Sequence, residues 1–442
     1  MLDAGTYSLS TQPRKRLAEE RYRRGWSQEN VAHLLQTTRL TIGRWEHGLT
    51  TPGPYFRSRL CELFDLSATE LGLVPTPWSL PPSNRDVPRR DTGSAHIDPA
   101  FPLPATPIPL IGRDGERTRL KQGLLHTHPM AFSALYGLPG IGKTALTLDL
   151  LYDPEIQADF HDGILWAALG PSPDIAHLLK RWGDFLGIST RQAAPLTTRE
   201  ARAKALQTII GRRKLLVVLD DVWQMEDALA CAVGGPNCAY LLTTRFPQLA
   251  LSFSSGQAMQ LCELDDQRSL HLLQRLAPAA VSQEPALAQS LAQAVGGLPL
   301  ALTLMGNAVR SEAHDGQPRR TRAALVRLLH AGERLRLAEP RSILERSPGL
   351  PSSLVSLQAV IALSEQRLDV QARRSLRALA QAFRARPDIF SEEDALNVCH
   401  GSIEALDALS DAGLLQSAGA GHYTLHPTIA DYARFVPLTC EE

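Results

Sequence analysis

Short apolar runs alternate with amphipathic stretches between residues 111 and 260. Charged or turn residues flank each run, which is typical of strands buried on both faces of a parallel sheet. Helical patterns such as residues 143–152 and 197–213 lie between the runs. This alternation predicts a doubly wound α/β domain over residues 109–260. The runs are AFSALYG (131–137), GILWAAL (163–169), KLLVVLDD (214–221) and AYLLTTR (239–245).

Further along the chain the apolar residues repeat at helical spacing only. Residues 264–277 carry this pattern, and so do residues 285–297, which end at a Gly-Gly pair that would stop a helix. We expect the strands to stop here and a helical domain to occupy residues 261–345. The arginine-rich segment from Arg310 to Arg346 could form a nucleic-acid-binding face, although its interspersed acids favour a solvated helical surface.

The C-terminal part combines helical patterns with one hairpin signal. From Leu350 onward, three helical stretches precede LLQSAGAGHYTLH (414–426), in which two short strands flank a Gly-Ala-Gly turn. Three helices followed by a hairpin predict a winged-helix domain over residues 346–436.

A proline-rich segment separates the first 73 residues from these domains. Ten of the 37 residues from Val74 to Leu110 are proline, which sustains neither a helix nor a central strand. We expect residues 74–108 to form a semi-extended linker.

Composition sets limits on the class of protein. A chain of 442 residues is long enough for two to four domains. Its 46 basic and 46 acidic residues exclude a protein that coats nucleic acid uniformly, but not a local basic module. The six cysteines are scattered without a CxxC pair, and neither a secretory signal nor a membrane span is evident. We expect a soluble cytoplasmic protein that does not bind membranes.

The strongest chemical signal is a glycine-rich loop between a predicted strand and a predicted helix. Residues 137–144, GLPGIGKT, match the phosphate-loop pattern GxxxxGK[ST]. Glycines such as Gly137, Gly140 and Gly142 let backbone N–H groups surround a phosphate. Lys143 would reach the β- and γ-phosphates, and the Thr144 hydroxyl would bind Mg²⁺.

Polar residues at the ends of two later strands support this site. Asp220 and Asp221 follow an apolar run, at the sheet edge where α/β proteins bind ligands. One carboxylate could hold Mg²⁺ and the other could orient a water, although a pair of acids there could also only cap the next helix. Arg245 ends the next run and could sense a γ-phosphate, whereas an arginine at a strand end is more often a surface residue.

Six motifs together resemble the NB-ARC domain, the nucleotide switch of STAND NTPases, over residues 109–436. The resemblance implies bound ADP at rest, exchange for ATP on activation and slow hydrolysis. It also implies a shift of the winged helix that permits self-association. The motifs are LIGRDGE (110–116), GLPGIGKT (137–144), LLVVLDDVW (215–223), LLTTR (241–245), GGLPLAL (296–302) and LHP (425–427).

The resemblance assigns roles residue by residue. Asp220 matches the Mg²⁺-binding carboxylate, Asp221 the residue that positions the hydrolytic water, and Arg245 the sensor arginine. His426 matches the histidine that contacts the ADP β-phosphate and locks the closed form, but Pro427 stands where the family has Asp. The remaining nucleotide-binding matches are Ile111 and Arg113 on the adenine side, Gly140, Ile141, Gly142, Lys143, Thr144 and Ala145 in the phosphate loop, and Pro299 against adenine.

The N-terminal residues 11–73 resemble the XRE/Cro-like helix-turn-helix family. Helical patterns at 27–36, 37–48 and 57–66 carry WSQENVA and TIGRWEHG, which match the second and third helices of that family. Between Pro13 and Gly48 eight basic residues face four acids. We expect DNA to bind through residues 13–66, with Trp26 and Trp45 in the core. The expected DNA contacts are Gln28, Thr38, Arg39, Thr41 and Arg44.

The combined modules lead to one main hypothesis and two alternatives. The main one is an ADP/ATP-switched STAND regulator that binds DNA and oligomerises in the ATP state. In the alternative, a signalling or defence switch, the N-terminal module recruits a protein effector. A fast housekeeping ATPase is less favoured, because the family switches slowly. The expected cofactors are ATP or ADP with Mg²⁺, and the expected trigger is a separate sensor protein, a small molecule or nucleic acid.

Overall fold

The computed structural model describes most of the chain in two parts. The first is residues 15–46, except 36 and 38. The second is residues 110–437, except 127–130, 189–197, 256–257, 313–316, 341–353 and 384–388, and isolated positions between 52 and 100 are described as well. The chain divides into two compact units, Met1–Arg90 and Asp91–Glu442. Thr38 and nearly all of the predicted linker lie outside the described residues.

The described residues of the first unit include three successive helices and a small apolar core. These are α1 (Lys15–Arg23), α2 (Gln28–Leu34) and α3 (Arg39–Glu46). Ser27 caps α2, since its side chain accepts a hydrogen bond from the Asn30 N–H. Trp45 is buried in the core and Trp26 packs against it, as the sequence predicted.

A buried ion pair joins α1 to α3. The Arg21 guanidinium donates to both carboxylate oxygens of Glu46, at 2.6 and 3.0 Å, and to the Trp26 carbonyl oxygen at 2.9 Å. Both charged side chains are 5% exposed. Gln28 Nε2 also donates to Glu46, at 2.7 Å, so this carboxylate orients the first residue of α2 as well.

The second unit is built on a five-stranded parallel sheet, and each of the four apolar runs forms one of its strands. The order is β2-β3-β4-β1-β5. The two-residue strand β5 is too short to produce a recognisable pattern. The strands are β1 (Phe132–Tyr136), β2 (Gly163–Gly170), β3 (Leu215–Val222), β4 (Ala239–Thr244) and β5 (Met259–Gln260).

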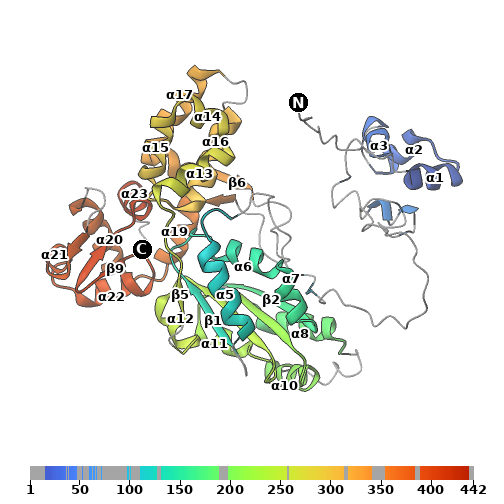
Figure 1. Ribbon diagram of the computed structural model, residues 1–442, viewed down its shortest axis with the longest axis horizontal. Helices are drawn as coiled ribbons and strands as arrows, with labels where there is room; N and C mark the ends of the chain where they lie inside the picture. Colours follow the sequence, from blue (N-terminus) through green and yellow to red (C-terminus); the bar gives the residue numbers. More distant parts are fainter. Residues whose placement is uncertain are drawn as a thin grey trace, which may run out of the picture. The chain divides into compact units, whose positions relative to one another are not determined.

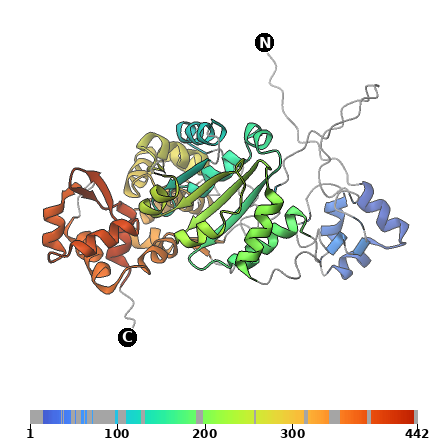
Figure 2. The same cartoon turned by 90° about the horizontal axis from the view of Figure 1, so that it is seen from below.

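Helices cover both faces of this sheet, as Figures 1 and 2 show, which confirms the doubly wound α/β fold. Alternate residues of β2 belong to two different apolar clusters, with Ile164 and Trp166 in one and Leu165 and Ala167 in the other. The first cluster includes residues of α5 (Asp114–His126), α6 (Lys143–Leu151) and α7 (Pro154–Asp159). The second includes residues of α8 (Ile175–Leu186), α10 (Arg199–Ile210), α11 (Met225–Ala230) and α12 (Pro247–Phe253).

Between β5 and residue 336, the regular elements among the described residues are all helices. Proline is the first residue of four of them, a position where its missing N–H costs no hydrogen bond. The helices are α13 (Asp266–Leu276), α14 (Pro278–Gln283), α15 (Pro285–Ala294), α16 (Pro299–Glu312), α17 (Pro318–Leu328) and α18 (Ala331–Arg336).

The C-terminal region has the predicted hairpin and more strands than predicted. Strands β9 (Gln416–Gly419) and β10 (His422–Thr424) pair antiparallel, and β8 (Ile389–Ser391) completes a three-stranded sheet. Strands β6 (Ala338–Pro340) and β7 (Leu354–Ser356) form a second pair. The expectation that strands stop at residue 261 was therefore wrong, because three-residue strands show no periodicity. The helices here are α19 (Leu357–Glu365), α20 (Val370–Ala382), α21 (Glu392–Val398), α22 (Ile403–Asp411) and α23 (Pro427–Phe435).

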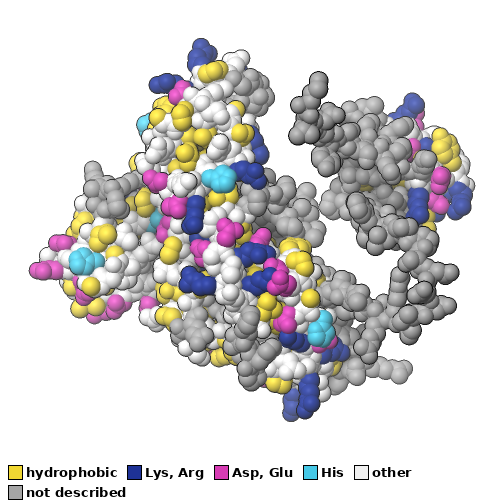
Figure 3. All heavy atoms as spheres, in the orientation of Figure 1, with side chains coloured by type: hydrophobic (Ala, Val, Ile, Leu, Met, Phe, Trp, Pro, Cys, Tyr) yellow, Lys and Arg dark blue, Asp and Glu magenta, His cyan; other side chains and the backbone are white. Residues whose placement is uncertain are grey.

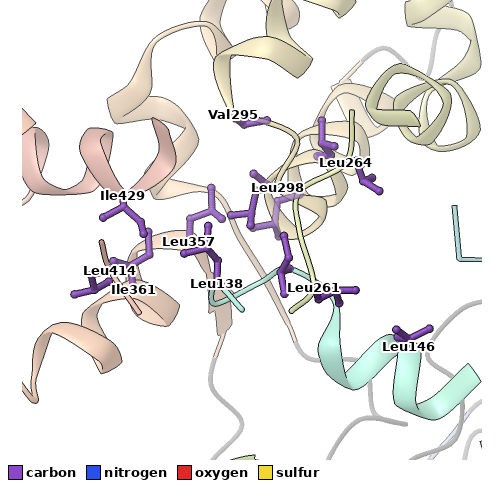
Figure 4. Packing of buried hydrophobic residues seen from close by; sticks show 14 of the residues in the cluster. Leu138, Leu146, Leu261, Leu264, Val295, Leu298, Leu357, Ile361, Leu414 and Ile429 are labelled. Carbon is purple, nitrogen blue, oxygen red and sulfur yellow. The ribbon is translucent and has the colours of Figure 1, made fainter. Parts of the chain in front are cut away.

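One apolar cluster continues from the sheet into the C-terminal helices. Leu138 of the glycine-rich loop belongs to it together with Leu298, Leu357, Ile361 and Ile429. Figure 4 shows these side chains gathered from the loop, the helical region and the C-terminal helices. A change in the relative position of these three regions would therefore disturb the packing of this cluster.

Neither a disulfide nor a membrane-spanning helix is found among the described residues. The cysteines that the structure describes, Cys61, Cys231, Cys238, Cys262 and Cys399, are free. Among the described helices, none has the length and apolar character needed to cross a lipid bilayer.

The ion pair in the first unit gives a stability prediction. Glu46→Ala leaves the Arg21 guanidinium buried without its carboxylate, which should destabilise this unit by about 3–5 kcal/mol. Glu20→Ala is the control, because Glu20 pairs with the more exposed Arg23 and Arg24 and should cost less than about 1 kcal/mol. Hydrogen exchange of α1–α3 in a urea series would measure both; equal effects would contradict the assignment.

Candidate nucleotide-binding site

The glycine-rich loop between β1 and α6 has the backbone of a phosphate cradle. Gly137, Gly140 and Gly142 have φ values of +148°, +80° and +98°. A Cβ at Gly137 would lie 2.6 Å from the Leu261 carbonyl oxygen, whereas a Cβ at Gly142 would meet nothing within 4 Å. Gly142 is the N-cap of α6 and provides no side-chain cap. The first N–H groups of this helix thus face a side where an anion fits.

Lys143 is held inside this loop. Its side chain is buried, and its ammonium group donates to the carbonyl oxygens of Gly137 at 2.9 Å and Leu138 at 3.0 Å. Burial, with the nearby positive charge of Arg245, lowers the pKa of Lys143 to about 8, although Asp221 and Asp220 oppose the shift. An ammonium buried with so little negative charge around it is suited to an anionic ligand.

Asp220 lies opposite the loop at the end of β3. Its carboxylate accepts hydrogen bonds from the hydroxyls of Thr144, at 2.9 Å, and Thr243, at 2.7 Å. Burial raises the pKa of Asp220 to about 6 despite these hydrogen bonds. The two residues predicted to hold Mg²⁺, Thr144 and Asp220, are therefore in direct contact, and hydroxyl and carboxylate oxygens are ligands that this ion accepts.

Asp221 follows in a strained conformation. Its φ is +51°, unusual for a residue other than glycine, and the pairing of β3 with β4 shifts register here. Its carboxylate accepts hydrogen bonds from Trp223 Nε1 at 3.1 Å and Arg245 Nε at 3.3 Å. Because of this irregularity, the two consecutive acids bind different partners. Asp220 accepts from the two threonine hydroxyls, and Asp221 accepts from Trp223 and Arg245.

Arg245 connects this edge of the sheet to α19. The guanidinium is 7% exposed, so the alternative of a surface arginine was wrong. Besides Asp221, it contacts α19, where it donates to the Val360 carbonyl oxygen at 2.8 Å and the Ser364 hydroxyl at 3.1 Å. Its guanidinium carbon also lies 5.0 Å from the centroid of the Trp223 ring.

The Gly-Gly-Leu-Pro segment before α16 joins the loop to the last helix. Pro299 is the first residue of α16, and the next N–H, of Leu300, donates to the Gly140 carbonyl oxygen at 3.1 Å. His426 approaches from the other side, with Nε2 3.2 Å from the Gly296 carbonyl oxygen. Gly296 has φ +56°, and a Cβ there would lie 2.9 Å from His426 Nε2, so only glycine fits.

His426 also starts the last helix. Its Nδ1 accepts a hydrogen bond from the Thr428 N–H at 3.2 Å, and Pro427 is the first residue of α23. Because Nδ1 is an acceptor, Nε2 carries the proton and donates to Gly296. The structure thus gives the histidine a structural contact beside Pro299.

The remaining predicted nucleotide-binding residues surround the same loop. Arg113 is buried, pairs with Glu116 at 3.0 Å and donates to the Ile141 carbonyl oxygen at 3.3 Å. Ile111 packs half-buried against the large apolar cluster, and Ala145 is exposed in the first turn of α6. The sequence therefore identified residues that the fold brings together.

Sequence reasoning missed several partners in this site. The sequence carried only a weak indication of Thr243. Side chains alternate between the two faces of a strand, and Thr243 of β4 lies on the face where its hydroxyl reaches Asp220. Trp223 follows the acids directly. Val360 and Ser364 gave no signal, because the contact depends on how α19 packs more than a hundred residues further along.

The predicted DNA contacts lie on α2 and α3 of the first unit. Arg39 is exposed at the start of α3 and Thr41 is half-buried. Gln28 is half-buried and bonded to Glu46. Thr38 and the side chain of Arg44 lie outside what is described.

Part of the arginine-rich segment forms an exposed face of α17, where basic side chains gather in Figure 3, whereas Arg334 of the same segment is buried. Arg319, Arg320, Arg322 and Arg327 are all exposed. Two of them pair with acids, Arg322 with Glu284 and Arg327 with Glu312. This partial neutralisation agrees with the solvated helical surface that the interspersed acids favour.

The loop, the parallel sheet and the acids at its edge define a P-loop nucleotide-binding domain. Residues 113–282 match the NB-ARC domain family, and residues 17–71 match a helix-turn-helix family. The chain therefore contains an NB-ARC domain and an N-terminal helix-turn-helix domain, as its motifs predicted.

The chain is similar to known regulatory proteins over part of their length. The chain is 27% identical over 340 residues to the regulatory protein AfsR of Streptomyces griseus, and 26% identical over 355 residues to that of Streptomyces coelicolor. These alignments cover 75% and 78% of this chain, but it spans only about a third of the relatives, 33% and 34%. The solved ORC2 protein of Aeropyrum pernix aligns at 14% identity with a TM-score of 0.44, over 76% of this chain and 97% of that one.

The buried carboxylate predicts a pH-dependent stability. The pKa of Asp220 is raised from 3.8 to about 6, so the folded protein without nucleotide loses stability as the pH rises through this interval. Asp220→Asn should stabilise it at pH 7 by as much as about 3 kcal/mol, since each pKa unit is worth about 1.4 kcal/mol. The gain should vanish below about pH 4.

Chemical denaturation at pH 4, 5, 6 and 7 measures this gain. Asp174→Asn is the control, because Asp174 is exposed and caps α8, a role in which Asn serves equally. A stabilisation by Asp220→Asn that is the same at every pH would contradict the burial of the charge.

Proposed function

We propose that this chain is a nucleotide-switched transcriptional regulator. Its helix-turn-helix module binds DNA, and the nucleotide in the NB-ARC domain sets whether the chains self-associate. The observation that carries the switch is the position of Arg245, whose guanidinium contacts Asp221 at the nucleotide edge and Val360 and Ser364 on α19. One side chain thereby connects the nucleotide site to the C-terminal helices.

ATP or ADP with Mg²⁺ fits the groups at this edge. The open side at Gly142 and the buried ammonium of Lys143 suit the phosphates, and Thr144 and Asp220 offer oxygens to the metal. When bound, the magnesium nucleotide supplies the negative charge that this positively charged loop lacks. Ile111, Arg113 and Pro299 are the candidates for holding the adenosine end, on the strength of the family resemblance.

Asp221 is the candidate for orienting a hydrolytic water. Both of its carboxylate oxygens already accept hydrogen bonds, one from Arg245 and one from Trp223. Its oxygens are therefore already engaged by side-chain donors and less available to a water, so we expect slow hydrolysis.

Arg245 can release α19 when a better acceptor is present. A guanidinium binds phosphate oxygens more strongly than a neutral backbone carbonyl. We infer that Arg245 favours the docked α19 with ADP and loses its contacts to Val360 and Ser364 with ATP. The freed C-terminal helices would then be available for self-association, which increases the avidity of the paired DNA-binding modules.

A substitution of Arg245 tests the switch. Arg245→Ala removes charged hydrogen bonds worth about 1.5–3 kcal/mol, so hydrogen exchange of α19 with ADP bound should rise about tenfold or more. Wild type should show faster exchange of α19 with ATP than with ADP, and the variant should show no such difference.

Arg367→Ala is the matched control for this test. Arg367 lies 4.2 Å from the Phe246 ring centroid and donates to the Trp223 carbonyl oxygen at 3.3 Å, in the same interface but away from Asp221. It should speed exchange of α19 while preserving the difference between ATP and ADP. An Arg245→Ala protein that retains this difference would refute the proposed switch.

A second prediction concerns DNA. Arg39→Ala should weaken binding to promoter DNA from the protein's own locus by about 1–3 kcal/mol, because Arg39 is exposed at the start of α3. Arg23→Ala, which removes the same charge from the exposed end of α1, should have a smaller effect. Gel mobility shifts with both nucleotides measure the affinities. Absence of specific binding in either state would favour a protein partner for this module.

A further inference from the structure

The described part of the proline-rich segment lies on the outer edge of the sheet. β2 is the last strand in the sheet order, and Ile97 pairs with Ile164 in parallel orientation. The Asp98 N–H donates to the Ile164 carbonyl oxygen at 3.0 Å. Ile97 packs against the large apolar cluster. This short segment thus satisfies backbone groups that an edge strand would leave open.

The Asp98 carboxylate occupies a site built from β2 and α8. It is 1% exposed, and one oxygen accepts hydrogen bonds from Trp182 Nε1 at 2.9 Å, the Arg181 guanidinium at 3.2 Å and the Trp166 N–H at 3.3 Å. The other accepts from the Ala100 N–H at 3.0 Å. A buried carboxylate is stable only with such a set of donors.

These donors select a particular occupant. A cation and an indole N–H meet one carboxylate oxygen, while the adjacent strand edge accepts and donates backbone hydrogen bonds. The site therefore fits an extended segment with an acidic residue after an apolar one. Ile97 and Asp98 provide this pair, with the apolar side chain and the acid on opposite faces as strand geometry requires.

We propose that Ile97, Asp98 and Ala100 anchor the chain that leads to the N-terminal module on the outer edge of the nucleotide-binding sheet. Ile97 lies 26 residues after Leu71, which is buried in the core of the first unit, whereas Leu110 lies 39 residues after it. Fully extended chains of these lengths span at most about 90 and 135 Å, so the anchor lowers the upper limit on the reach of the DNA-binding module by about a third.

Asp98→Ala tests the anchor in the full-length protein. Hydrogen exchange at residues 97–100 and at the Trp166 amide should rise at least about tenfold, and the radius of gyration in solution should increase. Exchange in the phosphate loop and retention of nucleotide should stay unchanged, which shows that the domain remains folded. Arg181→Gln, which removes the cation from the same carboxylate, should produce a smaller change in the same direction.

A control substitution on α8 and two contrary outcomes make the proposal falsifiable. Asp184→Ala removes an exposed acid of α8 and should alter neither exchange nor size. Unchanged exchange at residues 97–100 in Asp98→Ala would overturn the proposal. A concentration-dependent dimer that Asp98→Ala dissolves would also overturn it, because the segment would then dock on a second copy. None of these readouts requires DNA binding, so the anchor and the proposed function can fail separately.

Discussion

The burial of charged side chains at the carboxyl edge of the sheet is the constraint on which the rest of the second unit depends. Lys143, Asp220 and Arg245 are 7%, 6% and 7% exposed. Burial lowers the pKa of the lysine to about 8 and raises that of Asp220 to about 6. Burial therefore disfavours the charged form of both side chains in the protein without a ligand. Groups held in this way are suited to an anionic ligand, because folding has already removed water from them.

The same constraint attaches the C-terminal helices. A buried guanidinium must find acceptors, and Arg245 finds them on α19. A second buried pair, Arg334 of α18 with Asp431 of α23, joins the helical region to the last helix with both side chains under a tenth exposed. Separating Arg334 from Asp431 would leave two charges without their partners in apolar surroundings, which costs several kcal/mol. Moving α19 away would remove two of the acceptors of Arg245. Such contacts favour two discrete arrangements over a continuum, which is the property that a switch requires.

Sequence alone could predict the strands, the phosphate loop and the pairing of Thr144 with Asp220, because these follow from local pattern and from the rule that parallel strands end at one edge. It could not predict the strands β6, β7 and β8, since three residues carry no periodicity. The acceptors of Arg245 were also hidden, because they lie more than a hundred residues away and one is a backbone oxygen. Within the segment predicted to be only a linker, the anchoring role of Asp98 depends on Arg181 and Trp182, and no local pattern connects these residues.

Pro427 stands where the NB-ARC motif has an acid, and yet His426 contacts the Gly296 carbonyl oxygen. The histidine is therefore oriented by something other than an acid next to it. Its side chain must be held in one orientation to reach the Gly296 carbonyl oxygen. Here Pro427 fixes the backbone at the first turn of α23, and His426 Nδ1 accepts the Thr428 N–H. This hydrogen bond keeps the imidazole proton on Nε2, which faces Gly296. Covalent restraint and a helix cap thereby orient the histidine without an acid, so the contact between His426 and Gly296 does not depend on an Asp at this position.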